Sequence, residues 1–274
     1  MARQALGLSI ALRISDLDLE SYLSSLLCDL TPSTSSGLVE GYEIPDPAAE
    51  RVYQLLRDGR EVNAHFRPGS AADALLGDLN LRAIEASRHL LLLHAGACAI
   101  GDDAVVLCGQ SGSGKTTLTA GLVESGLDYL TDETVALDPD DLTIVPWPKP
   151  LTLKRGSWPV LPHLAPEPGS LAERFTSDVW HVPASRIRPG SVAGPGTRPR
   201  AVVLPSYTPG AGVRLEPVSR GEAAMTLFEQ TSYGADHGPR VVDLLCDLLE
   251  PCTTHRLLFD DHAGAVEAVR SLLP

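Results

Sequence analysis

Residues 109 to 116, Gly-Gln-Ser-Gly-Ser-Gly-Lys-Thr, carry the most specific chemical pattern in the chain. They satisfy G-x-x-x-x-G-K-[ST], in which glycines let the backbone wrap closely around phosphate oxygens. Backbone amides and a helix start then face the phosphates. Lys115 is expected to reach the β- and γ-phosphates of a nucleotide, and the Thr116 hydroxyl is expected to bind Mg²⁺. The predicted nucleotide-binding residues are Gly109, Gln110, Ser111, Gly112, Ser113, Gly114, Lys115, Thr116 and Thr117.

The sequence around this motif predicts a strand, a phosphate loop and a helix, in that order. Residues 104 to 108 are continuously apolar, as expected of a strand that is buried on both faces. Leu118, Leu122 and Val123 fit one face of a helix that Gly126 would end. This context favours a true nucleotide site over a plain glycine turn.

An acidic pair, Asp132-Glu133, follows the next predicted strand, residues 129 to 131. Ligands of α/β sheets bind beyond the carboxyl ends of strands, so both carboxylates are expected beside the phosphate loop. One carboxylate could hold Mg²⁺ while the other takes a proton from an attacking hydroxyl. The alternative is a solvated turn that opens a hairpin of residues 135–137 and 142–145.

Two further features bear charge, and each has a structural alternative. His94 follows four leucines, and a histidine in that setting is commonly a buried structural residue. Lys149, Lys154 and Arg155 form a basic cluster, and a cation can stabilise a phosphoryl-transfer transition state. Within this cluster, Lys154 or Arg155 is the expected catalytic or substrate-binding residue. Ordinary surface charge on long loops is the other interpretation. The later basic residues open to both interpretations are Arg174, Arg186, Arg188, Arg198 and Arg200.

Composition limits the classes of protein to consider. The chain has 274 residues, 43% hydrophobic and 21% charged, which predicts an ordinary buried core. A net charge of −13 disfavours nucleic-acid binding. Five scattered cysteines without a CxxC pair indicate reduced thiols in a cytoplasmic protein. We expect no signal peptide, because the N-terminus lacks a basic segment followed by an apolar stretch. We expect no membrane association, because no apolar run approaches the roughly 20 residues of a membrane span.

The order of predicted elements gives an α/β fold with two parts. Residues 1–69 are expected to form a small α+β segment, and residues 70–274 a catalytic domain. In the first part, strands are predicted at residues 7–14, 38–44 and 61–66, a helix at 16–30 and a loop at 31–37. The second part is expected to open with a long helix from Ser70, where Asp73 completes a capping box, through the leucines at 90–93, either continuous or interrupted near Asn80.

The remaining elements of the second part follow from turn signals and apolar spacing. Strands at residues 97–100 and 104–108 are predicted to form a hairpin around Gly101-Asp102-Asp103. Residues 146–200 are expected to be mostly loops because they are rich in proline, glycine and arginine. The later predictions are strands at 201–204, 212–216 and 256–259, and helices at 220–232, 239–249 and 262–273.

The stretch from Leu93 to Leu137 resembles the catalytic core of HPr kinase/phosphorylase. That core has a histidine before two strands, a phosphate loop, a helix, and an acidic pair ahead of a valine. Here these are His94, residues 109–116, and Asp132-Glu133 followed by Val135. The resemblance implies a P-loop kinase core of the HPr kinase C-terminal domain type, with ATP and Mg²⁺ as cofactors. It implies Asp132 as the catalytic base, with Lys115 and His94 also catalytic, and Thr116 and Glu133 at the metal.

The chain looks closer to short HPr kinase-related paralogues that accompany ribosomal and lasso peptide gene clusters. Residues 146–159 resemble a segment of these paralogues, and the family's Arg-Gly-Leu-Gly segment does not follow the acidic pair. The implied activity is transfer of the γ-phosphate to a serine-type hydroxyl of a peptide, a small protein or an amino acid. Such relatives are often oligomeric, so a homo-oligomer is one expected state. The alternative function is a non-catalytic ATP-binding regulatory or maturation partner. Transport ATPases and GTPases are disfavoured because their Leu-Ser-Gly-Gly-Gln and Asn-Lys-x-Asp motifs are missing from the sequence.

Overall fold

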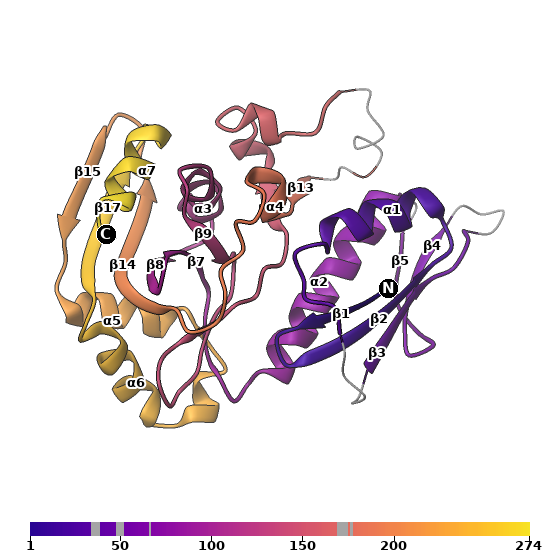
Figure 1. The fold of residues 1–274 in the computed structure, drawn as a ribbon, viewed down its shortest axis with the longest axis horizontal. Helices are drawn as coiled ribbons and strands as arrows, with labels where there is room; N and C mark the ends of the chain where they lie inside the picture. The colour runs from indigo at the N-terminus through magenta and orange to yellow at the C-terminus, as the bar shows by residue number, and fades with distance from the viewer. Residues whose placement is uncertain (34–38, 48–51, 66, 169–174, 176–177) are drawn as a thin grey trace. The chain divides into compact units, whose positions relative to one another are not determined.

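The protein is described from a computed structural model of residues 1–274, in which residues 34–38, 48–51, 66, 169–174 and 176–177 are not described. The described residues form two compact units (Figure 1). The first unit contains Met1–Ser87 and Thr152–Pro183, and the second contains Arg88–Leu151 and Ala184–Pro274. Both units mix helices with strands, in agreement with the predicted α/β class. The predicted domain boundary at residue 70 stays a prediction.

The first unit is built on a five-stranded sheet in the order β1-β2-β3-β4-β5. The elements are β1 (Ala2–Ala5), β2 (Leu8–Ile14), α1 (Leu17–Leu26), β3 (Val39–Ile44), β4 (Tyr53–Arg57), β5 (Arg60–His65) and α2 (Pro68–Ala86). Alternate residues of β2 and β3, such as Ile10 and Tyr42, are buried, and α1 and α2 cover this face (Figure 1). The predicted helix and the described parts of the predicted strands are confirmed, while β1 and β4 were not predicted. Residues 38 and 66, at the ends of two predicted strands, lie outside the described residues. Residues 34–37 of the predicted loop lie outside the described residues.

The predicted long helix from Ser70 through the leucines is wrong at both ends. It begins at Pro68, with Arg67 in the extended N-cap position, so Ser70 caps nothing. It ends at Ala86, and Leu91–Leu93 form a strand, β6. The error has a physical cause, since a short apolar run fits a buried strand as well as a buried helix.

Residues 152–183 add irregular structure and a two-stranded sheet to the first unit. The elements are β12 (Leu151–Lys154), the 3-10 helices η1 (Arg155–Ser157) and η2 (Pro162–Leu164), and β13 (Val179–Val182). The segment predicted as mostly loop therefore contains short regular elements as well. His181 Nε2 lies 2.7 Å from Asp73 Oδ1, which ties β13 to α2.

The second unit is built on a six-stranded sheet in the order β15-β17-β14-β8-β7-β9. The strands are β7 (Ala95–Ile100), β8 (Asp103–Cys108), β9 (Asp128–Thr131), β14 (Arg198–Tyr207), β15 (Val213–Pro217) and β17 (Thr253–Phe259). The predicted hairpin of β7 and β8 is confirmed, with Gly101 in the left-handed region at φ 56°. Strands β8, β14 and β17 are parallel to one another. Strand β7 is antiparallel to both β8 and β9, so β9 runs in the same direction as β8.

This topology gathers the candidate site at one edge of the sheet. Strands β8, β9, β14 and β17 all end there, and β7 begins there. The phosphate loop follows β8, Asp132 follows β9, and His94 precedes β7. The carboxyl ends of parallel strands are the usual ligand-binding edge of an α/β sheet.

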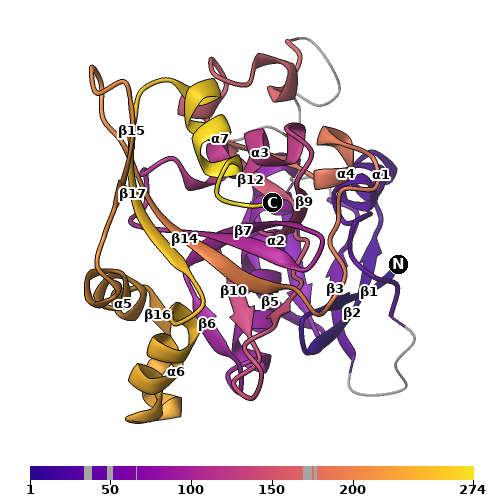
Figure 2. The ribbon, with the colours of Figure 1, turned by 60° about the vertical axis from the view of Figure 1, so that its left-hand side comes forward.

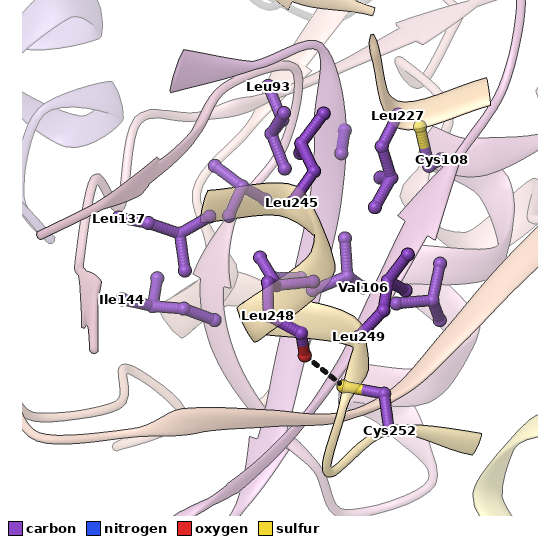
Figure 3. Packing of buried hydrophobic residues seen from close by; sticks show 14 of the residues in the cluster. Leu93, Val106, Cys108, Leu137, Ile144, Leu227, Leu245, Leu248, Leu249 and Cys252 are labelled. Atoms are coloured by element: carbon purple, nitrogen blue, oxygen red, sulfur yellow. Dashed lines mark hydrogen bonds between the residues drawn. The ribbon is translucent and has the colours of Figure 1, made fainter. Parts of the chain in front are cut away.

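Helices cover both faces of the six-stranded sheet, as Figure 2 shows. Helices α3 (Lys115–Glu124) and α7 (His262–Arg270) lie on one face. On the other face α5 (Arg220–Glu229) and α6 (Arg240–Leu249) pack against the sheet and bury a leucine-rich core (Figure 3). The Cys252 thiol donates to the Leu248 carbonyl at 3.0 Å within this core. The helices predicted after the phosphate loop and at 239–249 and 262–273 are confirmed.

The same core includes a second sheet, in the order β11-β10-β6-β16. Its members are β6, β10 (Val135–Leu137), β11 (Ile144–Val145) and β16 (Thr231–Ser232). The predicted hairpin of β10 and β11 is confirmed, whereas β16 occupies residues predicted as the end of a helix. A short helix, α4 (Ala184–Ile187), and a 3-10 turn, η4 (Gly234–His237), complete the described elements of this unit.

None of the helices in the described part of the chain combines the length and the apolar character needed to cross a lipid bilayer.

Candidate functional site

The phosphate-loop motif adopts a conformation that its glycines make possible. Gly112 and Gly114 have φ values of 85° and 99°, in the left-handed region that favours glycine. A Cβ atom on Gly114 would also lie 2.7 Å from Phe259 Cζ, so glycine is required there on steric grounds as well. The backbone therefore turns sharply between β8 and α3.

The Lys115 side chain is directed back toward this turn. Its ammonium group donates to the carbonyl of Gly109 at 2.5 Å and to that of Gln110 at 3.0 Å. The side chain is almost buried, although it starts the first turn of α3. A buried cation bound to loop carbonyls is held in place for a negatively charged ligand.

The loop fits a phosphate group on two observations. The N-cap of α3 is Gly114, which has no side chain to cap the helix, and an uncapped helix N-terminus attracts anions. Within the described part of the chain, the buried Ser113 hydroxyl also has no hydrogen-bond partner. Buried polar groups are normally satisfied, which makes a ligand oxygen a natural partner for these donors.

Asp132 and Thr116 meet beside the loop. The Thr116 hydroxyl lies 3.2 Å from Asp132 Oδ1 and 3.1 Å from Oδ2. A hydroxyl next to a carboxylate suits Mg²⁺, which prefers oxygen ligands and usually keeps several waters. The described residues contain no cluster of three or more His, Cys, Asp or Glu side chains that could hold a metal alone. The Thr116 hydroxyl, together with a carboxylate of the acidic pair, fits a Mg²⁺ ion that also binds phosphate oxygens.

Asp132 is buried, and its surroundings shift its proton affinity. Burial raises the pKa of Asp132 above its usual value, and the negative charge of Glu133 raises it further. Lys149, the hydrogen bond from Thr116 and the charge of Lys115 act in the opposite direction. A carboxylate with a raised pKa is a better proton acceptor, which is the property that a general base needs.

Glu133 adopts a backbone conformation that is rare for a residue with a side chain. Its φ is 81°, in the left-handed region, which is disfavoured for any residue other than glycine, asparagine or aspartate. Such strain is typical of functional sites. The Glu133 carboxylate is half-exposed and pairs with the Lys149 ammonium at 2.8 Å.

Lys149 reaches the site because its segment runs alongside β9. The Trp147 amide donates to the Leu130 carbonyl at 3.0 Å, and the Tyr129 hydroxyl donates to the Lys149 carbonyl at 2.8 Å. The Lys149 side chain is buried and is the main positive charge acting on Asp132. A buried lysine beside Asp132 offsets part of the cost of burying that carboxylate.

His94 lies at the same edge of the sheet, between two segments. Its amide donates to the Gln230 carbonyl at 2.7 Å, and the next amide, of Ala95, donates to the Glu133 carbonyl at 3.2 Å. Burial lowers the pKa of His94, and the charge of Lys115 lowers it further. The imidazole is therefore neutral near pH 7, so it can exchange hydrogen bonds without adding charge.

Comparisons with known proteins add little to this geometry. No family model matches the chain, and no curated protein matches it in sequence. Among solved structures, the Hpr(Ser) kinase/phosphatase from Coxiella burnetii is similar at 12% identity and a TM-score of 0.34. The similarity covers 66% of this chain and 87% of that chain. Because this similarity is low, the function proposed below rests on the residues of this chain.

The structure brings together the predicted residues His94, 109–117, Asp132 and Glu133, all within the second unit. Lys154 and Arg155 belong to the first unit, and a role for them stays a prediction. Three of the later arginines have partners in their own unit. Arg188 binds Asp128, Arg200 binds Asp103 and Arg198 lies near Asp141. Arg174 lies outside the described residues.

Sequence reasoning did not single out Lys149 from its basic cluster, nor Tyr207 and Phe259 at the ends of β14 and β17. For Lys149 the only signal in the sequence was its place two residues after Trp147, a residue that the structure shows to be fully buried. Phe259 is the last residue of the strand predicted at residues 256–259. Tyr207 lies three residues beyond the strand predicted at residues 201–204, and in the structure that strand extends to Tyr207.

We predict that Gly96→Ala destabilises the protein because a Cβ atom there would lie 2.8 Å from Thr119 Oγ1. Both atoms are buried, and Thr119 is β-branched, so the clash is hard to relieve. Overpacking of this kind lowers the free energy of unfolding by about 1 to 3 kcal/mol. Urea unfolding of Gly96→Ala, Thr119→Ala and the double variant gives the coupling between the two sites. If Thr119→Ala does not recover part of the loss, this contact is not the cause.

Proposed function

We propose that the protein is an ATP-dependent kinase of the HPr kinase-related type, which phosphorylates a serine-type hydroxyl. The observation that carries the proposal is the contact of Thr116 with Asp132 beside the phosphate loop, at 3.1 Å. This contact brings a metal-binding hydroxyl and a proton acceptor to one end of a phosphate cradle. The acceptor is a peptide, a small protein or an amino acid.

Each residue of the site has a defined part in the proposal. The loop amides, the Ser113 hydroxyl and Lys115 would hold the phosphates, while Thr116 and Glu133 would hold Mg²⁺. When bound, Mg–ATP supplies a transferable γ-phosphoryl group whose charge the metal partly neutralises. Asp132 accepts the proton of the acceptor hydroxyl as its oxygen bonds to phosphorus, giving a phosphorylated acceptor and ADP. Neutral His94 donates or accepts a hydrogen bond at the same end of the loop.

The first test is nucleotide binding by Lys115→Met, measured by titration calorimetry with Mg–ATP. Loss of hydrogen bonds between a cation and phosphate is expected to weaken binding by about 10- to 100-fold. Arg200→Met, which removes a cation of a surface ion pair, is the matched control and should bind like the original protein. If Lys115→Met binds Mg–ATP as tightly as the original protein does, the nucleotide does not bind at this loop.

The second test is transfer of labelled γ-phosphate to serine-containing peptides and to free serine. Phosphorylation of any of these acceptors supports the kinase, and the identity of the acceptor defines the substrate class. Tight Mg–ATP binding without transfer to any acceptor would support a nucleotide-binding regulator in place of an enzyme.

A further inference from the structure

The path of a nucleotide along the sheet edge can be read from the order of the strands. Asp132 and His94 lie beyond β9 and β7, on one side of β8. When the terminal phosphate of the nucleotide faces Asp132, the ribose and the base lie at the opposite end of the molecule. That end is then directed away from Asp132 and His94, toward β14 and β17. Strand β14 lies directly beside the loop, because a Cβ atom on Gly109 would be 3.6 Å from the Pro205 carbonyl oxygen. This direction rests on the function proposed above.

Two aromatic residues stand at that end. Tyr207 is the last residue of β14, Phe259 is the last residue of β17, and the two are register partners. Their ring centroids are 5.8 Å apart at an interplanar angle of 78°, an edge-to-face contact. The Phe259 ring is buried against Gly114 of the phosphate loop. The Phe259 ring therefore contacts both the Tyr207 ring and the phosphate loop.

Exposure distinguishes Tyr207 from its partner. Tyr207 is 55% exposed, whereas Phe259 is 4% exposed. The residues that follow Tyr207 are also held, since the Thr208 amide donates to the Phe259 carbonyl at 2.8 Å and the Gly210 amide donates to Asp260 Oδ2 at 2.6 Å. An aromatic ring that is rigidly supported on one edge and open to solvent offers a planar surface for a planar ligand.

We infer that Tyr207 forms the stacking surface for the base of the bound nucleotide, with Phe259 as the residue that positions it. Stacking on an aromatic ring tolerates any base, since every base has a π-face. Tyr207 is therefore expected to strengthen nucleotide binding in general without selecting adenine over guanine. The ligand class is a nucleoside triphosphate held by its phosphates at the loop and by its base at Tyr207.

The test compares binding of Mg–ATP with binding of inorganic tripolyphosphate, which lacks the ribose and the base. Tyr207→Ala is expected to raise the Kd for ATP about 10-fold and to leave the Kd for tripolyphosphate within about twofold. Tyr207→Phe and Tyr207→Trp should keep the original affinity for both. Phe228→Ala is the matched control, because Phe228 is also an exposed aromatic residue, at 48%, but lies on α5. It should change neither Kd.

The outcomes separate this inference from the function on which it rests. If the original protein binds ATP more tightly than tripolyphosphate and Tyr207→Ala keeps that difference, the base lies elsewhere and the inference is wrong. Equal affinity of the original protein for both compounds also overturns it, because the base then adds nothing. If the original protein binds neither compound, the proposed function fails and the base site fails with it.

Discussion

Asp132→Asn is expected to lower the rate of phosphoryl transfer by at least about 100-fold, while Mg–ATP binds with nearly unchanged affinity. The amide cannot take a proton from the acceptor hydroxyl, and general-base catalysis contributes about 10² to 10⁴ in rate. Its oxygen can still accept the hydrogen bond that Thr116 gives at 3.1 Å, so the loop should keep its shape. Single-turnover transfer and calorimetric binding measure the two effects separately.

The same substitution should make the protein without ligand more stable at neutral pH. The raised pKa of Asp132 means that the folded protein holds this proton more tightly than the unfolded chain does. Stability is therefore lost as the pH rises above the ordinary value of 3.8 and through the raised pKa of the folded state. Asp132→Asn removes this loss, so its free energy of unfolding should exceed that of the original protein at neutral pH.

Thermal unfolding between pH 4 and pH 8 checks this expectation. The difference in Tm between Asp132→Asn and the original protein should grow with pH. Asp102→Asn, which changes an exposed carboxylate in the turn between β7 and β8, is the matched control and should show no such trend.

A normal rate of phosphoryl transfer in Asp132→Asn would remove Asp132 from the reaction. A large loss of Mg²⁺ affinity would instead assign it to the metal.

Lys149→Met is expected to lower activity at neutral pH and to move the acidic limb of the pH–rate profile to higher pH. Lys149 is the largest influence that lowers the pKa of Asp132, so removing it raises that pKa further. More of the base is then protonated at neutral pH, and activity should recover as the pH is raised. A merely structural role would lower the rate equally at every pH.

The effect of Lys149→Met on stability should be moderate. Removing one member of a fully buried ion pair costs about 3 to 5 kcal/mol. The Glu133 side chain is 43% exposed, so solvent screens its charge and a loss of about 1 to 2 kcal/mol is expected. Lys149→Arg keeps the charge and should keep most of the activity. An unchanged pH–rate profile in Lys149→Met would show that Lys149 does not act on the base.

The sequence was sufficient for elements whose boundaries are set locally. Gly101-Asp102-Asp103 forces a tight hairpin, and the motif at 109–116 fixes a strand, a turn and a helix, so β7, β8 and α3 were predictable. The leucines at 90–93 were not, because four apolar residues satisfy a buried helix and a buried strand equally. What decides between them is pairing with β10 and β16, which lie about 40 and 140 residues further along the chain.

The residues of the candidate site also fall into those that the sequence could predict and those that it could not. His94, Lys115 and Asp132 could be predicted because each lies next to an element that the local pattern defines. Lys149 could not be separated from Lys154 or Arg155, since only the pairing of its segment with β9 shows which cation faces the acidic pair. Tyr207 and Phe259 meet through the parallel pairing of β14 and β17, and no local pattern predicts a parallel register.

The most direct measurement is a crystal structure of the protein soaked with Mg²⁺ and a non-hydrolysable ATP analogue. We expect the three phosphates inside the loop formed by residues 109–116, with the terminal phosphate facing the carboxylate of Asp132. Well-ordered analogue bound elsewhere, or bound in the loop with its terminal phosphate directed away from Asp132, would contradict this account.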